Sequence, residues 1–174
     1  LEAMSRNYTR EWYMDKITMI RNMMNDCGIS CDIIAGFCTE TEEEHQDTLS
    51  LIEWAKFDFS YMYKYSERPG TPAAKKFTDD IPEDVKGRRL SEIIAIQNKV
   101  SKEKSTEYIG KEVVVLVENS SKKSDLDWMG RNDQNLVVVF PKESYQKGDF
   151  VKVLVERCTT TTLIGKAIGM ASIA

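Results

Sequence analysis

The segment from Gly28 to Glu44 reads as a short strand, a turn and the start of a helix. Residues 30–35 are mostly apolar and include two β-branched isoleucines, and a glycine flanks the run on either side. This pattern is typical of a parallel strand that is covered on both faces. Thr41 stands three residues before Glu44, which is the spacing of a capping box. A strand that leads directly into a helix predicts a βαβ fold, in which ligands gather at the carboxyl ends of the strands.

Four residues near this predicted edge are candidates for ligand binding: Arg6, Asp32, Gly36 and Arg68. A carboxylate buried among the isoleucines would cost several kcal/mol, as an order of magnitude, unless a partner compensates it. Asp32 therefore either has such a partner or lies hydrated at the entrance of the strand. The two arginines should lie on the carboxyl-end rim, where a guanidinium can grip a carboxylate or phosphate through two hydrogen bonds. Solvation or a structural ion pair is the alternative for both.

The rest of the first part is helical with one further strand. Helices are predicted from Thr9 to about residue 24, from about 42 to 55, and from Pro82 to about 104, and Gly28 suits a left-handed helix end. A strand over 57–65 alternates clearly. Two parallel strands with three helices do not close a barrel, so residues 1–104 are expected to be part of a larger βα fold. The inner stripe of the last helix is expected to comprise Val85, Leu90, Ile93, Ile94, Gln97 and Val100.

From about residue 105 the pattern changes to short β segments separated by turn residues. Strands are predicted over 112–118, 126–130, 136–140, 150–156 and 161–168. Five strands in about 60 residues indicate a small closed β-barrel over 105–170. Residues 170–174 show no pattern and are expected to be a frayed end.

Composition limits the class of protein. Charged residues make up 30% and hydrophobic residues 41% of the 174 residues, as in ordinary soluble domains. No apolar run approaches the ~20 residues needed to cross a membrane. We therefore expect a cytoplasmic protein, a monomer without membrane contact, whose cysteines are thiols. The net charge is −4, so contact with a nucleic acid must depend on local basic clusters.

The cysteines and the single histidine do not predict a metal site. Cys27, Cys31 and Cys38 are spread over a helix end, a strand and a loop, whereas an iron–sulfur cluster needs several thiolates on one flexible loop. Free buried thiols are the better interpretation. His45 stands on a glutamate-rich first helical turn, where a solvated position is expected, and the glutamates beside it are interpreted as a solvated helix start.

Basic residues in two turns of the β-rich part are candidates for nucleic-acid contact. Lys122 and Lys123 lie in a serine-flanked hairpin tip, and Arg131 follows a glycine in the next predicted turn. On a small barrel such turns can contact phosphates, although a solvated loop has the same composition.

Taken together, three motifs in order resemble the methylthiotransferases of the radical S-adenosylmethionine class. They are Met-Ser-Arg-Asn-Tyr-Thr-Arg-Glu at 4–11, Asp-Ile-Ile-Ala-Gly-Phe at 32–37 with Glu-Thr-Glu-Glu at 40–43, and Tyr-Ser-Glu-Arg-Pro-Gly-Thr-Pro-Ala-Ala at 65–74. The last part, from Val-Leu-Val-Glu at 115–118 to Gly-Asp at 148–149, is similar to the TRAM domain, a tRNA-binding β-barrel of that family.

The resemblance implies the end of an incomplete TIM-like radical S-adenosylmethionine barrel followed by a TRAM barrel. It also implies a tRNA substrate, a methylthio group added to N6-isopentenyladenosine beside the anticodon, S-adenosylmethionine, and two 4Fe-4S clusters whose ligands are not in this chain. By resemblance Arg6, Asp32, Gly36 and Arg68 would bind the cofactor, and Lys122, Lys123 and Arg131 would contact tRNA. A non-catalytic protein that binds RNA through the barrel alone is the alternative.

Overall fold

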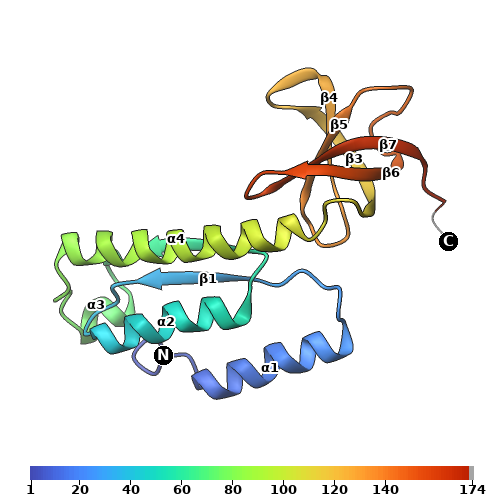
Figure 1. Ribbon diagram of the computed structural model, residues 1–174. Coiled ribbons are helices and arrows are strands. Elements are labelled where there is room, and N and C mark those ends of the chain that lie inside the picture. The colour runs from blue at the N-terminus through green and yellow to red at the C-terminus, as the bar shows by residue number, and fades with distance from the viewer. Residues whose placement is uncertain (173–174) are drawn as a thin grey trace. The chain divides into compact units, whose positions relative to one another are not determined.

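In the computed structural model, which describes residues 1–172, the chain forms two compact units (Figure 1). The first comprises residues 1–26 and 30–97, and the second comprises residues 27–29 and the chain from residue 98 onward. The division falls inside the long helix α4, Glu83–Thr106. The sequence had placed the boundary at residue 104, near the end of the same helix.

The first unit contains a βαβ arrangement. Strands β1 (Ser30–Ala35) and β2 (Phe59–Lys64) pair in parallel, and α2 (Glu42–Ala55) connects them. Helix α1 (Arg10–Met23) precedes β1, and a five-residue helix α3 (Pro72–Lys76), which the sequence pattern did not predict, follows β2. The predicted order of strand, helix, strand and long helix is confirmed.

The core of this unit lies on one face of the two-stranded sheet. Ile33 and Ala35 of β1 are buried together with residues of α2 and of α4, so both helices pack on that face. The opposite face carries Ile34, Tyr61 and Tyr63, which are 38%, 57% and 55% exposed. The prediction that β1 is covered on both faces is therefore wrong for this chain, because the helices cover one face only.

Local signals set the helix ends. The Thr41 hydroxyl accepts a hydrogen bond from the Glu44 backbone N–H, and the Glu44 carboxylate accepts one from the Thr41 N–H, which is the predicted capping box. Gly28 does not form the predicted left-handed helix end, since α1 is capped at Met24. A Cβ at Gly28 would lie 2.6 Å from the carbonyl oxygen of Gln134, so close backbone approach explains this glycine.

The buried stripe of α4 differs from the predicted one. Ile93, Gln97 and Val100 are buried as expected, but Ile94 is 37% exposed. The stripe continues toward the amino end of the helix through Lys86 and Arg89, which are buried although they are charged. Pro82 precedes the helix and accepts its first backbone hydrogen bond, from the Lys86 N–H, rather than being the first helical residue.

The second unit is a closed five-stranded barrel, as predicted, and its strands follow the order β3-β4-β5-β7-β6. Its strands are β3 (Glu112–Ser121), β4 (Ser124–Arg131), β5 (Val137–Pro141), β6 (Phe150–Cys158) and β7 (Thr162–Met170). Alternate residues point inward, and ten of them form a buried core of valines with two leucines and a phenylalanine.

The chain end is ordered further than expected. Strand β7 includes Met170, and the Ala171 N–H donates to the Phe150 carbonyl, so the predicted frayed end begins too early. Residues 173–174 of that predicted end lie outside the described part of the chain. Among the described residues no helix combines the length and the apolar character that crossing a membrane requires.

Candidate functional site

The carboxyl edge of the two-stranded sheet is shaped by Gly36. It follows β1 with a φ of +73°, a region that favours glycine, and a Cβ there would lie 2.5 Å from Cγ of Lys86. Its backbone N–H donates to the Glu40 carboxylate at 2.9 Å. Both the backbone conformation and the packing therefore require glycine at this predicted site position.

Two buried cations of α4 hold this edge. The Arg89 guanidinium, with only 5% of its side chain exposed, donates to both the backbone carbonyl and the carboxylate of Glu40 at 2.9 Å. The Lys86 ammonium, with 2% of its side chain exposed, donates to Asp79 at 2.6 Å and to Glu83 at 3.1 Å. Sequence reasoning missed both cations, and the only signal was that they continue the helical spacing of Ile93.

A cleft of about 840 Å³ opens on the first unit beside the exposed face of the sheet. Arg6 and Asp32, two of the predicted site residues, line it together. Both are exposed, so the hydrated alternative for Asp32 is the one that the structure shows. Gly36 and Arg68 are not among the residues that line this cleft, and Arg68 is exposed in the loop after β2.

Two aromatic side chains, Tyr8 and Tyr13, line the cleft. Tyr8 stacks on both Trp12 and Tyr13, with ring centroids 5.6 and 5.9 Å apart. Burial raises the pKa of Tyr13 to about 12. The phenol therefore stays neutral over the physiological range and offers a hydroxyl group and a ring face, but no negative charge, to the cleft.

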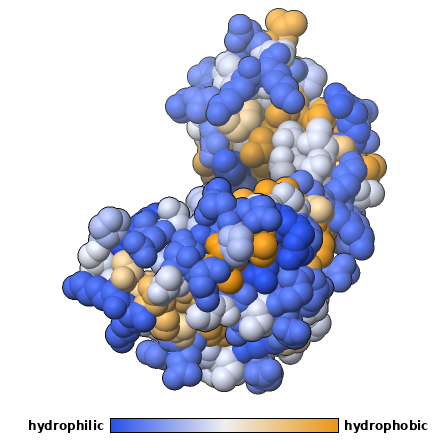
Figure 2. Space-filling model, turned by 90° about the vertical axis from the view of Figure 1, so that its left-hand side faces the viewer, coloured by the Kyte–Doolittle hydropathy of each residue, from blue (hydrophilic) through white to orange (hydrophobic). Residues whose placement is uncertain are grey.

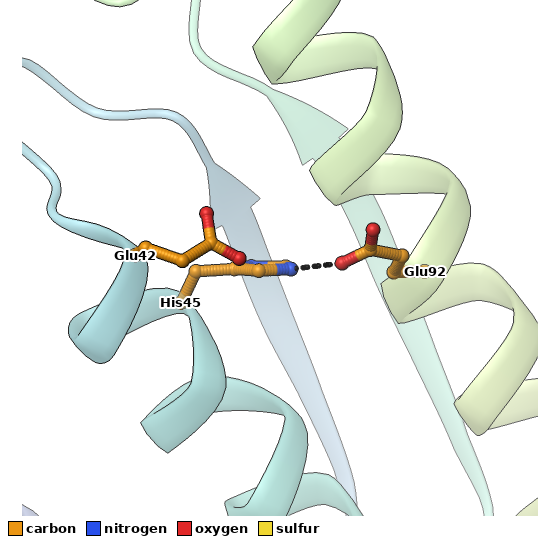
Figure 3. A group of neighbouring side chains, drawn as sticks. All are labelled: Glu42, His45 and Glu92. Atoms are coloured by element: carbon orange, nitrogen blue, oxygen red, sulfur yellow. Dashed lines mark hydrogen bonds and ion pairs between the residues drawn. The ribbon is translucent and has the colours of Figure 1, made fainter.

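His45 was expected to be solvated, and this expectation is wrong. The imidazole is 1% exposed, and its Nε2 lies 2.6 Å from a carboxylate oxygen of Glu92 on α4 (Figure 3). The overlooked signal is helical spacing, because His45, Leu49 and Ile52 lie on the same face of α2.

Glu42, His45 and Glu92 are the one group of metal-ligating type in residues 1–172, yet their carboxylates already have cationic partners (Figure 3). Arg88 bridges the two glutamates, at 2.7 Å from Glu42 and 2.9 Å from Glu92. Hydrogen bonds from Arg88 are the main cause that lowers the pKa of Glu42 to about 2. The group is thus an ion-pair network between α2 and α4, and it gives no reason to place a metal there.

The four cysteines are free thiols, as predicted, but of the three that were expected to be buried only Cys38 is, whereas Cys27 and Cys31 are partly exposed. In the described chain they form no group of three metal-ligating side chains. Cys38 is buried beside Phe37 and Tyr65, while Cys158 in the barrel lies 3.3 Å from the Lys102 ammonium. These thiols do not fit an iron–sulfur cluster, which needs several thiolates within reach of one another.

In the barrel, Lys122 and Lys123 form the two-residue tip between β3 and β4, and both are exposed as predicted. Arg131 is not in a turn but is the last residue of β4. Its guanidinium donates to the Asn135 carbonyl at 2.9 Å and lies 3.5 Å from the Glu118 carboxylate. Only the two lysines therefore extend freely from their turn.

A basic residue that sequence reasoning missed lies beside the same hairpin, close to its tip. The Lys142 ammonium lies 4.5 Å from the ring centroid of Trp128 and donates to the Ser120 hydroxyl at 2.7 Å. This cation–π contact joins two residues that are distant in the sequence, so the sequence pattern of neither residue predicts it.

Residues 106–168, which include most of the barrel, match the TRAM domain. The chain therefore contains a TRAM domain that follows a βα unit. Over almost its whole length the chain is also similar to proteins named tRNA-2-methylthio-N(6)-dimethylallyladenosine synthase. It is 56% identical to that of Christiangramia forsetii over 98% of this chain and 36% of the relative. It is 59% identical to that of Amoebophilus asiaticus over 95% of this chain and 34% of the relative.

The resemblance to the methylthiotransferases that the motifs predicted is thereby confirmed. The chain spans about a third of the length of the curated relatives that it matches.

Proposed function

We propose that this chain is part of a cytoplasmic, monomeric tRNA methylthiotransferase that acts on N6-dimethylallyladenosine. This nucleoside is also called N6-isopentenyladenosine. The observation that carries the proposal is the identity of 50–59% to six synthases of that name, together with the TRAM match. On this proposal the first unit is the final portion of an incomplete TIM-like barrel.

The cleft of the first unit would bind S-adenosylmethionine, which supplies the radical precursor when it is bound. The available groups match a zwitterionic amino acid, because the Asp32 carboxylate can accept from an ammonium group and the Arg6 guanidinium can donate to a carboxylate. Gly36 would set the backbone shape at the carboxyl edge of the sheet, and Arg68 would approach the cofactor from the loop after β2. Two 4Fe-4S clusters would be held by residues outside this chain, since its own thiols do not fit a cluster.

The barrel would bind tRNA, with Lys122 and Lys123 as phosphate contacts. Arg131 would be a weaker third contact, because its guanidinium is already bonded to Asn135 and Glu118. The barrel half carries nine basic and nine acidic residues, so long-range attraction is weak and a few local contacts must provide the affinity.

A salt series of tRNA affinity tests this proposal. Each lost phosphate contact reduces the log–log slope by about 0.7–0.9, so alanine at both Lys122 and Lys123 should reduce it by about 1.4–1.8. Adding Arg131→Ala should reduce the slope by less than a further 0.9. As a matched control, Lys166→Ala should leave the slope unchanged, because that lysine lies within β7 and is paired with Glu156 at 3.4 Å. Equal slopes for the unmodified chain and the double variant would place the RNA surface elsewhere.

Non-catalytic RNA binding by the barrel alone is the second candidate, and the self-contained barrel core favours it. Calorimetric titration with S-adenosylmethionine separates the two functions. Binding by the full-length protein that is weakened in Arg6→Ala and Asp32→Ala supports the enzyme, whereas absence of binding supports the RNA-binding module.

A further inference from the structure

A second, smaller cleft adjoins the first at the carboxyl edge of the sheet. It measures about 600 Å³ and shares the lining residues Glu2, Ala3, Met4 and Phe37 with the larger cleft, so the two clefts lie side by side. Figure 2 views the molecule from the end at which β1 and β2 terminate, and apolar surface there is framed by hydrophilic side chains. A ligand in the larger cleft could therefore extend a substituent into the smaller one.

The walls of this side cleft suit an uncharged, apolar group. Its apolar lining consists of Ala3, Met4, Phe37, Pro72, Ala73 and Phe77. The charged residues of the lining are Glu2 and Lys76, and both are exposed to solvent. A hydrocarbon group would gain from burial here without leaving a polar group unpaired.

The side cleft is built on fixed elements. Phe37 is 8% exposed and makes edge-on ring contacts with Tyr65 and Phe77, with centroids 4.9 and 6.0 Å apart. The opposite wall is α3, whose Thr71 cap accepts from the Ala74 N–H at 3.3 Å and donates to the Arg68 carbonyl at 2.8 Å. Walls whose positions are set by packing and capping can discriminate by shape.

We infer that the side cleft receives the N6-dimethylallyl group of the target adenosine and that Met4, Phe37, Ala73 and Phe77 determine specificity for it. The inference rests on the proposed function, which supplies the nucleoside. The group is a branched five-carbon hydrocarbon without hydrogen-bonding atoms, so only apolar contact can recognise it. Each buried carbon contributes about fourfold in affinity, which sets a ceiling of about 1000-fold for five carbons. Since the cleft is open on one side, half burial, or about 30-fold, is the expected preference.

The test measures the affinity of the full-length protein for an anticodon stem-loop RNA with either dimethylallyladenosine or adenosine at the target position. The unmodified protein should prefer the first RNA by about 30-fold. Ala73→Leu places three further carbons in the side cleft and should reduce the preference to less than about threefold. Ala74→Leu is the matched control, because Ala74 lies in the same helix but does not line either cleft, and it should retain the preference.

A second variant keeps the inference testable if Ala73→Leu does not fold. Met4→Ala enlarges the side cleft and should improve the relative affinity for RNA that carries the bulkier N6-benzyladenosine by about tenfold. Unchanged preferences in both variants would overturn the inference and leave the proposed function in place. A loss of S-adenosylmethionine affinity in Ala73→Leu, with the RNA preference intact, would assign the side cleft to the cofactor instead. Absence of methylthiolation by the unmodified enzyme would refute the proposed function, and the inference with it.

Discussion

Adjacent arginines on α4 offer a direct test of how much the buried charges stabilise the first unit. Arg88 and Arg89 both contact Glu42, but their side chains are 46% and 5% exposed. Replacing Arg89 by alanine leaves the Glu40 carboxylate, 14% exposed, with the Gly36 N–H but without its cation. Breaking a buried pair in this way costs about 3–5 kcal/mol.

Arg88→Ala is the matched control, and it should leave the free energy of unfolding unchanged within error. The guanidinium of Arg88 lowers the pKa of Glu42 strongly, but solvent screens an exposed pair and reduces its contribution to stability. Urea unfolding followed by circular dichroism at 222 nm measures both variants. With a typical slope of about 1–3 kcal/mol per M, Arg89→Ala should lower the midpoint by about 2 M. Equal midpoints for the two variants would refute the argument that burial decides the contribution.

Two further predictions concern packing and titration. Gly130→Ala should destabilise the barrel by about 1–3 kcal/mol, because the new Cβ would lie 2.1 Å from the Leu116 carbonyl oxygen. Gly87→Ala, which has open space around it in a helix, should stabilise the protein by about 0.5–1 kcal/mol. A raised urea midpoint in Gly130→Ala would contradict the first prediction, and a lowered midpoint in Gly87→Ala would contradict the second. Tyr13 should ionise near pH 12 in absorbance at 295 nm, and Tyr13→Phe should reduce the absorbance change near that pH by the contribution of one tyrosine. Its folded pKa is raised above 10, so its stabilising contribution is complete below pH 10 and is lost as the pH rises through 12; a Tyr13 step near pH 10 would show that burial does not raise its pKa.

Features that depend on local sequence were predicted well. The five barrel strands follow from alternating apolar residues and turn residues, because each barrel residue faces either the core or solvent. The capping box at Thr41 follows from spacing alone, since both of its hydrogen bonds lie within one turn. The hairpin tip at Lys122 and Lys123 was likewise set by short-range turn chemistry.

Features that depend on distant partners were not predictable in the same way. His45 looked solvated because its neighbours in sequence are glutamates, but its partner Glu92 is 47 positions away. Gly28 resembled a helix end, although its requirement comes from the backbone of Gln134, which is distant in sequence but belongs to the same unit. The hydrophobic pattern of α4 predicted that Ile94 is buried and gave no sign that Arg89 is. Such a pattern cannot show that the Glu40 carboxylate will pair with the Arg89 guanidinium inside the protein.

Two buried cations of the first unit, Lys86 and Arg89, lie at the turn that follows β1, and their position has a consequence for ligand binding. Lys86 and Arg89 lie on the buried face of α4, and burying two cations costs desolvation free energy. Their ion pairs with Asp79 and Glu40 offset this cost. Conversely, Arg89 helps to hold the Gly36–Glu40 turn, because its guanidinium donates to both the carbonyl and the carboxylate of Glu40. Helix and turn therefore depend on each other, and an intermediate arrangement would leave a charge unpaired in the core. Such mutual dependence fixes the edge of the sheet before any ligand arrives, so that binding in the adjoining clefts need not pay for ordering it.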